Sequence, residues 1–166
     1  MGVRTLFNLL GPLANPADAP YQLLGVGKPE LLDPLAGALA ELGTRQAVLV
    51  CSRDGLDEVS LAAPTMVRVV RGKEYDAREW SPAEFGLGEV PLTAIVADGP
   101  AESAAVIRRV LADEDVPARR IVLANAAAAL WAAEAVPTLR DGVERAAAAL
   151  TAGAPRALLE QLTRPN

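Results

Sequence analysis

The sequence predicts an α/β fold, with a mixed, largely parallel central sheet flanked by helices. Residues 21–51 are patterned as strand, helix and strand in succession, which is the signature of α/β proteins. Alanine-rich segments at residues 126–129 and 146–149 favour helices in the C-terminal part. A chain of 166 residues with 51% hydrophobic residues can bury one core, so we expect a single α/β domain over residues 1–166.

The first unit runs from a predicted strand at residues 21–26 to a second strand at residues 46–51. Pro29 suits the first position of the helix between them, and Gly43 ends that helix. The apolar residues of the helix recur at helical spacing, at Leu31, Leu35, Leu39 and Leu42. A right-handed crossover should therefore join two parallel strands.

The next segment is patterned as an antiparallel hairpin. Strands are predicted at residues 66–71 and 74–80, on either side of a turn at Gly72. Ser81 and Glu84 then have the spacing of a capping box, which predicts one short helical turn.

The remaining chain is predicted to be helical. One helix follows Gly99, and three more are predicted at residues 118–133, 138–152 and 155–162. The apolar residues 121–123 also fit a short buried strand, but the alanines that follow them favour a helix.

Two adjacent carboxylates, Asp57 and Glu58, lie in an acidic loop at residues 54–60, directly after the second predicted strand. In open α/β sheets, ligands bind just beyond the carboxyl ends of the strands. Gly55 allows a sharp turn, and we expect Leu56 to return to the core, which leaves the two carboxylates facing the crevice. Paired carboxylates suit Mg²⁺ that also holds the phosphates of a substrate. Taken alone, this loop also fits an ordinary solvated turn.

Composition excludes several kinds of site. The sequence has no histidine, which excludes a Ser-His-Asp triad, and a single cysteine, Cys51, which excludes a disulfide within one chain. The net charge of −5 argues against nucleic-acid binding by charge alone. No apolar run approaches the roughly 20 residues of a membrane-spanning helix. We expect a cytoplasmic protein that binds small molecules or another protein, and neither nucleic acid nor membrane.

Three single residues have a local interpretation. Arg4 is a fixed cation whose guanidinium could hold a carboxylate through two hydrogen bonds, although taken alone a surface arginine is the simpler interpretation. Asn125 is a polar residue within an apolar helix and should bond to a neighbouring backbone group. Cys51 is expected to be a small buried hydrophobe.

Three segments together resemble the anthranilate phosphoribosyltransferases of tryptophan biosynthesis. They are VRTLFNLLGPLANP at residues 3–16, DGLDEVS at residues 54–60 and NAAAAL at residues 125–130. Their order and spacing agree with that family. The similarity covers essentially this whole chain, but only about the C-terminal half of the family's usual chain.

The resemblance implies the large domain of the nucleoside phosphorylase and phosphoribosyltransferase fold, incomplete at its N-terminal side. It implies a glycosyltransferase that moves phosphoribosyl from phosphoribosyl pyrophosphate to the amine of anthranilate. Asp57 and Glu58 match the family's Mg²⁺ ligands, and Arg4 matches the arginine that contacts the anthranilate carboxylate. No catalytic residue is assigned. A homodimer, or a companion chain that supplies the other half, is the expected assembly.

Some features depart from the family's pattern. The family's helical N-terminal domain and Gly-rich pyrophosphate loop have no counterpart in these 166 residues, so we expect the chain alone to be inactive. Cys51-Ser52 stands where the family usually has His-Gly. Two alternatives remain: an enzyme like the pyrimidine nucleoside phosphorylases, against which the Arg4 segment argues, and a non-catalytic phosphate-binding, metal-binding or assembly domain.

Overall fold

The computed structural model describes residue 13 and residues 19–164 of the chain. Four strands form one sheet in the order β1-β2-β3-β4. The strands are Tyr21–Gly25 (β1), Gln46–Ser52 (β2), Thr65–Arg71 (β3) and Glu74–Trp80 (β4). The α-helices of the described part are Leu32–Glu41 (α2), Pro100–Leu111 (α3), Pro117–Ala132 (α4), Leu139–Thr151 (α5) and Ala154–Leu162 (α6). Short 3-10 helices lie at Pro29–Leu31, Pro82–Phe85 and Leu92–Ala94.

The sheet is mixed, as predicted, but less parallel than predicted. β1 pairs with β2 in parallel, whereas β2 with β3 and β3 with β4 pair antiparallel. The expectation of a largely parallel sheet is therefore wrong for the described strands. The reason is that parallel pairing requires a long crossover, which only α2 provides here, while a tight turn such as the one at Gly72 joins antiparallel strands.

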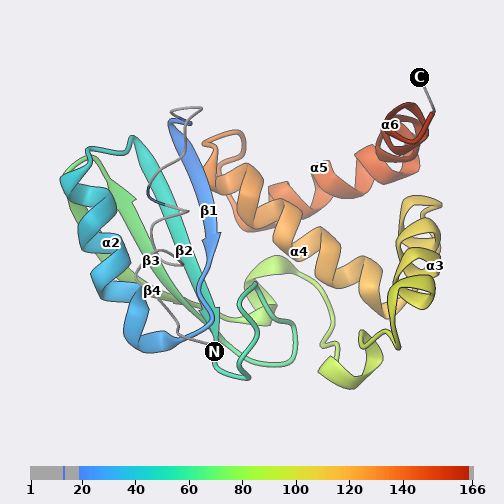
Figure 1. Cartoon of the computed structure of the whole chain (residues 1–166), viewed down its shortest axis with the longest axis horizontal. Helices are drawn as coiled ribbons and strands as arrows, with labels where there is room; N and C mark the ends of the chain where they lie inside the picture. The colour runs from blue at the N-terminus through green and yellow to red at the C-terminus, as the bar shows by residue number, and fades with distance from the viewer. Residues whose placement is uncertain (1–12, 14–18, 165–166) are drawn as a thin grey trace, which may run out of the picture.

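Helices cover both faces of β2, and every residue of this strand is buried. On one face, Ala47, Leu49 and Cys51 pack in a core cluster with α2. On the other face, Val48 and Val50 pack in a second cluster with residues of α4 and α5. Figure 1 shows α2 on one side of the sheet and α4 on the other. A strand covered on both faces is a continuous apolar run, which is why it could be recognised in the sequence.

The predicted C-terminal helices are confirmed with shifts of one residue at their ends, whereas the helix predicted to begin at Pro29 starts with a 3-10 helix and becomes α2 only at Leu32. Residues 121–123 lie within α4, so the helical interpretation of this apolar run is confirmed. Thr138 caps α5 because its Oγ1 accepts a hydrogen bond from the Asp141 amide at 3.1 Å. The predicted capping box of Ser81 and Glu84 is present in the short helix that follows β4.

α4 and α5 pack against each other with very little space between their backbones. Gly142 of α5 lies against Ala127 of α4, and a Cβ atom added to this glycine would lie 2.8 Å from the Ala127 Cα. Among the helices of residues 19–164, none is both long and apolar enough to cross a membrane.

Candidate functional site

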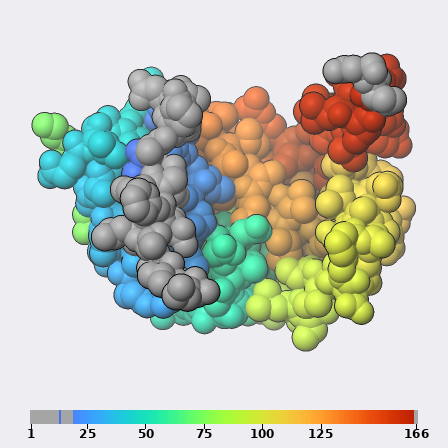
Figure 2. Space-filling model, in the orientation of Figure 1, coloured from blue at the N-terminus to red at the C-terminus, as the bar shows by residue number. Residues whose placement is uncertain are grey.

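The acidic loop lies at the carboxyl ends of β1 and β2. Because these two strands are parallel, both end at the same edge of the sheet, where α/β proteins bind ligands. Figure 2 shows the blue-green segment after β2 at the surface, between the blue β1 and the orange α4. A pocket of about 410 Å³ opens beside the loop and is lined by Leu23, Gly25, Val50, Asp57, Glu58 and Asn125.

Asp57 and Glu58 are both exposed and both line this pocket, as predicted. Neither side chain forms an ion pair or a hydrogen bond with another described residue, so their oxygens are available to a ligand. Over residues 13 and 19–164, no cluster of three or more acidic, cysteine or histidine residues could hold a metal ion. A pair of carboxylates still fits Mg²⁺, which commonly binds one or two carboxylates together with water and substrate phosphates.

Asp54 organises the backbone of the loop. Its Oδ2 accepts a hydrogen bond from the Ser60 hydroxyl at 2.6 Å, and its Oδ1 accepts one from the Leu56 amide at 3.2 Å. Partial burial alone would raise the pKa of Asp54, but hydrogen bonds from Ser60, Ser52 and the Leu56 amide outweigh it and lower the pKa below its ordinary value. Asp54 is therefore an ionised acceptor at neutral pH.

The core anchor of the loop differs from the predicted one. Leu56 is only half-buried, whereas Val59 and Leu61 are completely buried. The Leu56 carbonyl accepts a hydrogen bond from the Ser52 amide at 2.8 Å, which closes the turn. The prediction that Leu56 returns to the core is thus wrong, and Val59 takes that role.

Asn125 joins α4 to the loop. Its Oδ1 accepts a hydrogen bond from the Val59 amide at 2.9 Å, and its Nδ2 donates to the Val59 carbonyl at 2.9 Å. The Nδ2 also donates to the Ile121 carbonyl, one turn earlier in α4, at 3.1 Å. The predicted bond to a neighbouring backbone group is confirmed. The bonds to Val59 were missed, and the only signal for them was an amide within a run of alanines.

The other two predicted residues have different outcomes. Cys51 is buried, and burial followed by the negative charge of Asp57 raises the pKa of its thiol. It therefore stays a neutral, small hydrophobic group, as expected. Arg4 lies outside the described residues.

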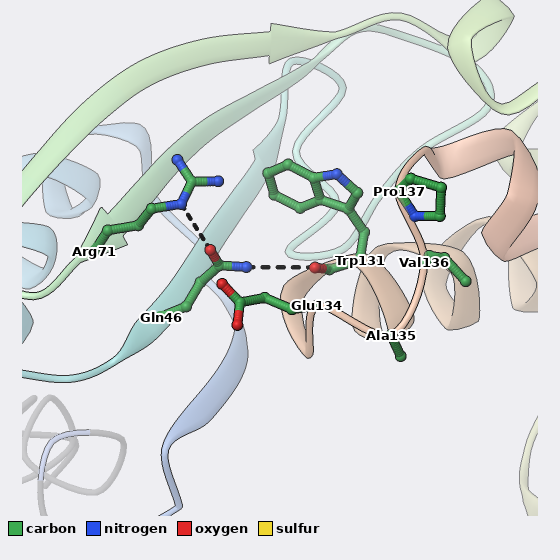
Figure 3. Close-up of a pocket in the computed structure, with 7 residues that line it drawn as sticks. All are labelled: Gln46, Arg71, Trp131, Glu134, Ala135, Val136 and Pro137. Carbon is green, nitrogen blue, oxygen red and sulfur yellow. Dashed lines mark hydrogen bonds between the residues drawn. The ribbon is translucent and has the colours of Figure 1, made fainter.

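A second pocket lies at the opposite end of β2, where the strand begins. Figure 3 shows Gln46 between Arg71 and the end of α4. The buried Gln46 donates to the Ala132 carbonyl at 2.9 Å and accepts from the Arg71 Nε at 2.8 Å. The Arg71 guanidinium also lies 5.7 Å from the centre of the Trp131 ring. Since helix C-termini leave carbonyl groups unpaired, these contacts secure α4 to the sheet and indicate a structural role.

The comparisons with known proteins agree with this geometry. The chain matches a protein family described as "Glycosyl transferase family, a/b domain" over residues 1–156. The chain belongs to this family. Among its relatives, the anthranilate phosphoribosyltransferase of Thioalkalivibrio sulfidiphilus is 47% identical over 162 residues, which are 98% of this chain and 48% of that protein. The resemblance seen in the three sequence segments is thereby confirmed.

Solved structures of anthranilate phosphoribosyltransferases have the same fold. The anthranilate phosphoribosyltransferase of Thermus thermophilus matches with a TM-score of 0.82 and 42% identity, over 96% of this chain and 47% of that one. The Saccharomyces cerevisiae enzyme in complex with PRPP and Mg matches with a TM-score of 0.80 and 28% identity, over 92% of this chain and 44% of that one. The chain thus spans about half the length of the relatives it matches.

Proposed function

We propose that this chain provides the metal-binding and pyrophosphate-binding part of an anthranilate phosphoribosyltransferase, as one α/β unit of a larger catalytic domain. The observation that carries the proposal is the position of Asp57 and Glu58. Both line a pocket at the carboxyl ends of two parallel strands, without a partner among the described residues. The family membership supports the same function.

The proposed reaction joins two small molecules without a covalent protein intermediate. The bond between the anomeric carbon of phosphoribosyl pyrophosphate and its pyrophosphate breaks. A bond forms between that carbon and the amine nitrogen of anthranilate, which gives up one proton. Because the amine is itself the nucleophile, the protein has to bind both substrates, orient them and accommodate the charge of the departing pyrophosphate. A chain without histidine is compatible with these tasks.

Asp57 and Glu58 are the proposed Mg²⁺ ligands. When bound, the ion would neutralise part of the negative charge on the pyrophosphate. The loop presents these two carboxylates to the pocket, while Asp54 is engaged with Ser60 and Leu56. The yeast relative has been solved in complex with PRPP and Mg, which supports this part of the proposal.

Arg4 is the proposed contact of the anthranilate carboxylate. The support is the segment around Arg4, which resembles the family, and a structure of the yeast relative in complex with 4-fluoroanthranilate. A planar guanidinium holds a carboxylate through two parallel hydrogen bonds, and lysine cannot reproduce that geometry. The expected homodimer or companion chain and the cytoplasmic location stay predictions.

Calorimetric titration of the 166-residue chain with Mg²⁺ and pyrophosphate tests the metal assignment. Asp57→Asn and Glu58→Gln keep the shape of each side chain but remove its charge, and each should weaken binding by at least about tenfold. Glu160→Gln is the matched control, because Glu160 is an exposed carboxylate on α6. The control should bind as the unchanged chain does. Equal binding by all variants would remove Asp57 and Glu58 from the metal site.

A further inference from the structure

We infer that Asn125 is the positioning residue that fixes the Asp57–Glu58 pair for binding of the metal and the pyrophosphate. This inference rests on the proposed function. It comes from the contacts of one side chain, which is the only one from α4 that lines the pocket beside the acidic loop.

Asn125 acts through the loop, because its own hydrogen-bonding groups are already engaged. An amide side chain has two N–H donors and one carbonyl acceptor. The two donors serve the Val59 and Ile121 carbonyls, and the acceptor serves the Val59 amide. The side chain therefore satisfies both backbone groups of Val59, while the bond to Ile121 fixes its orientation on α4.

Val59 directly follows Glu58 in the chain, so the position of Val59 fixes one end of the Asp57–Glu58 pair. Its side chain is completely buried in the core cluster between the sheet and α4. On the other side of the pair, the Asp57 carbonyl lies against β1, where a Cβ atom added to Gly25 would be 2.0 Å from the Asp57 oxygen. Asp57 and Glu58 are thus held between β1 and the Asn125 side chain of α4.

Without Asn125, both polar backbone groups of Val59 would lose their partner in the protein. Buried N–H and C=O groups without partners are destabilising, so the loop would move to let water reach them. Leucine at position 125 has the same branched shape, with two methyl groups in place of the amide oxygen and nitrogen, but it is larger and has no hydrogen-bonding group. Aspartate at position 125 can accept from the Val59 amide but cannot donate to the Val59 carbonyl, and it adds a negative charge beside the pocket.

The test combines two measurements on the 166-residue chain and its Asn125→Leu and Asn125→Asp variants. Hydrogen exchange measures the protection of the loop at residues 54–60, and calorimetry measures binding of Mg²⁺ with pyrophosphate. We expect exchange in the loop to become about tenfold faster in Asn125→Leu, because the Val59 amide loses its hydrogen-bond acceptor. We expect binding to weaken by about 10–100-fold, as for other residues that orient metal ligands.

Asn125→Asp separates positioning from simple electrostatics. In a titration with Mg²⁺ alone, an added carboxylate attracts the cation, so tighter binding would overturn the inference, whereas weaker binding supports it. Val122→Ala is the control for a change on the same helix, because Val122 is 43% exposed, and it should leave both measurements unchanged. Glu58→Gln should weaken binding but leave the loop protected, since it removes a ligand and not the anchor.

The outcomes for the inference and for the proposed function differ. Unchanged exchange in Asn125→Leu, or unchanged binding, would overturn the positioning role. Suppose that the chain without substitutions binds neither Mg²⁺ nor pyrophosphate, but hydrogen exchange in the loop is faster in Asn125→Leu. The proposed function then fails, and the anchoring of the loop by Asn125 is upheld. Circular dichroism spectra that match across the variants show that any loss of binding does not come from global unfolding.

Discussion

Three carboxylates within the acidic loop have different roles, because their surroundings differ. Asp54 accepts hydrogen bonds from the loop itself, whereas Asp57 and Glu58 face the pocket. A carboxylate that accepts several hydrogen bonds is stabilised in its ionised form, which lowers its pKa. Asp54 is therefore a structural residue, and the two later carboxylates are left for a ligand.

The pH dependence of stability should reveal the role of Asp54. Its pKa in the folded state lies below its ordinary value, so the ionised form stabilises the fold above about pH 4. This stabilisation is lost as the pH falls through the folded-state pKa. We predict that Asp54→Asn lowers the free energy of unfolding at pH 7 by about 1–2 kcal/mol. The difference from the unchanged chain should shrink below about pH 4.

Urea unfolding at pH 7, 5 and 3 measures this difference. Asp98→Asn serves as the control, because Asp98 is an exposed aspartate outside the loop. It should change the free energy of unfolding little at any pH. A difference for Asp54→Asn that stays constant with pH would show that the charge of Asp54 does not stabilise the loop.

The sequence allowed some residues of the site to be predicted, and the reason why others were missed is physical. Asp57 and Glu58 follow a recognisable buried strand, so their position at the edge of the sheet could be predicted. The choice between Leu56 and Val59 as the core anchor depends on how the loop backbone turns, which nearby sequence does not determine. The partner of Asn125 lies 66 residues earlier in the chain, and only the packing of α4 brings the two together.

Local signals determine the individual elements better than their arrangement. β2 is buried on both faces, β3 and β4 flank a glycine turn, and alanines continue α4 through an ambiguous apolar run. These features can be predicted from residues that are neighbours in the sequence. The proportion of parallel pairing cannot be predicted in this way, because it depends on how many crossovers the described sheet contains.

Two helical glycines offer a matched test of how α4 and α5 pack. A Cβ atom on Gly142 of α5 would lie 2.8 Å from the Ala127 Cα, whereas one on Gly37 of α2 would meet no atom within 4 Å. We predict that Gly142→Ala destabilises the chain by about 1–3 kcal/mol, because the helices must move apart. We predict that Gly37→Ala stabilises it by about 0.5–1 kcal/mol, because alanine favours the helical backbone.

Thermal and urea unfolding of both variants give the two changes in stability. Opposite signs are the expected result, since the substitution is the same and only the surrounding space differs. If Gly142→Ala is as stable as Gly37→Ala, then α4 and α5 do not pack as closely as the structure shows.

For the whole molecule, the charge around the pocket beside the acidic loop determines which steps the chain can perform by itself. The described lining of the pocket contains two carboxylates and no lysine or arginine. Pyrophosphate is strongly anionic, so a metal ion between it and the carboxylates would neutralise only part of its charge. The chain also spans about half the length of the relatives it matches. Binding of the metal and catalysis of the transfer are therefore separable predictions.

We predict that a polypeptide of these 166 residues alone transfers no detectable phosphoribosyl to anthranilate, although it binds Mg²⁺ with pyrophosphate. The physical reason is that holding two substrates in the correct relative orientation contributes a large part of the rate enhancement. Residues on one side of a site provide little of that orientation. Consumption of anthranilate, followed by its fluorescence, measures the transfer, and the Thermus thermophilus enzyme serves as the positive control. Turnover by the 166 residues would show that they hold both substrates by themselves, with Arg4 and the Asp57–Glu58 pair acting within one complete site.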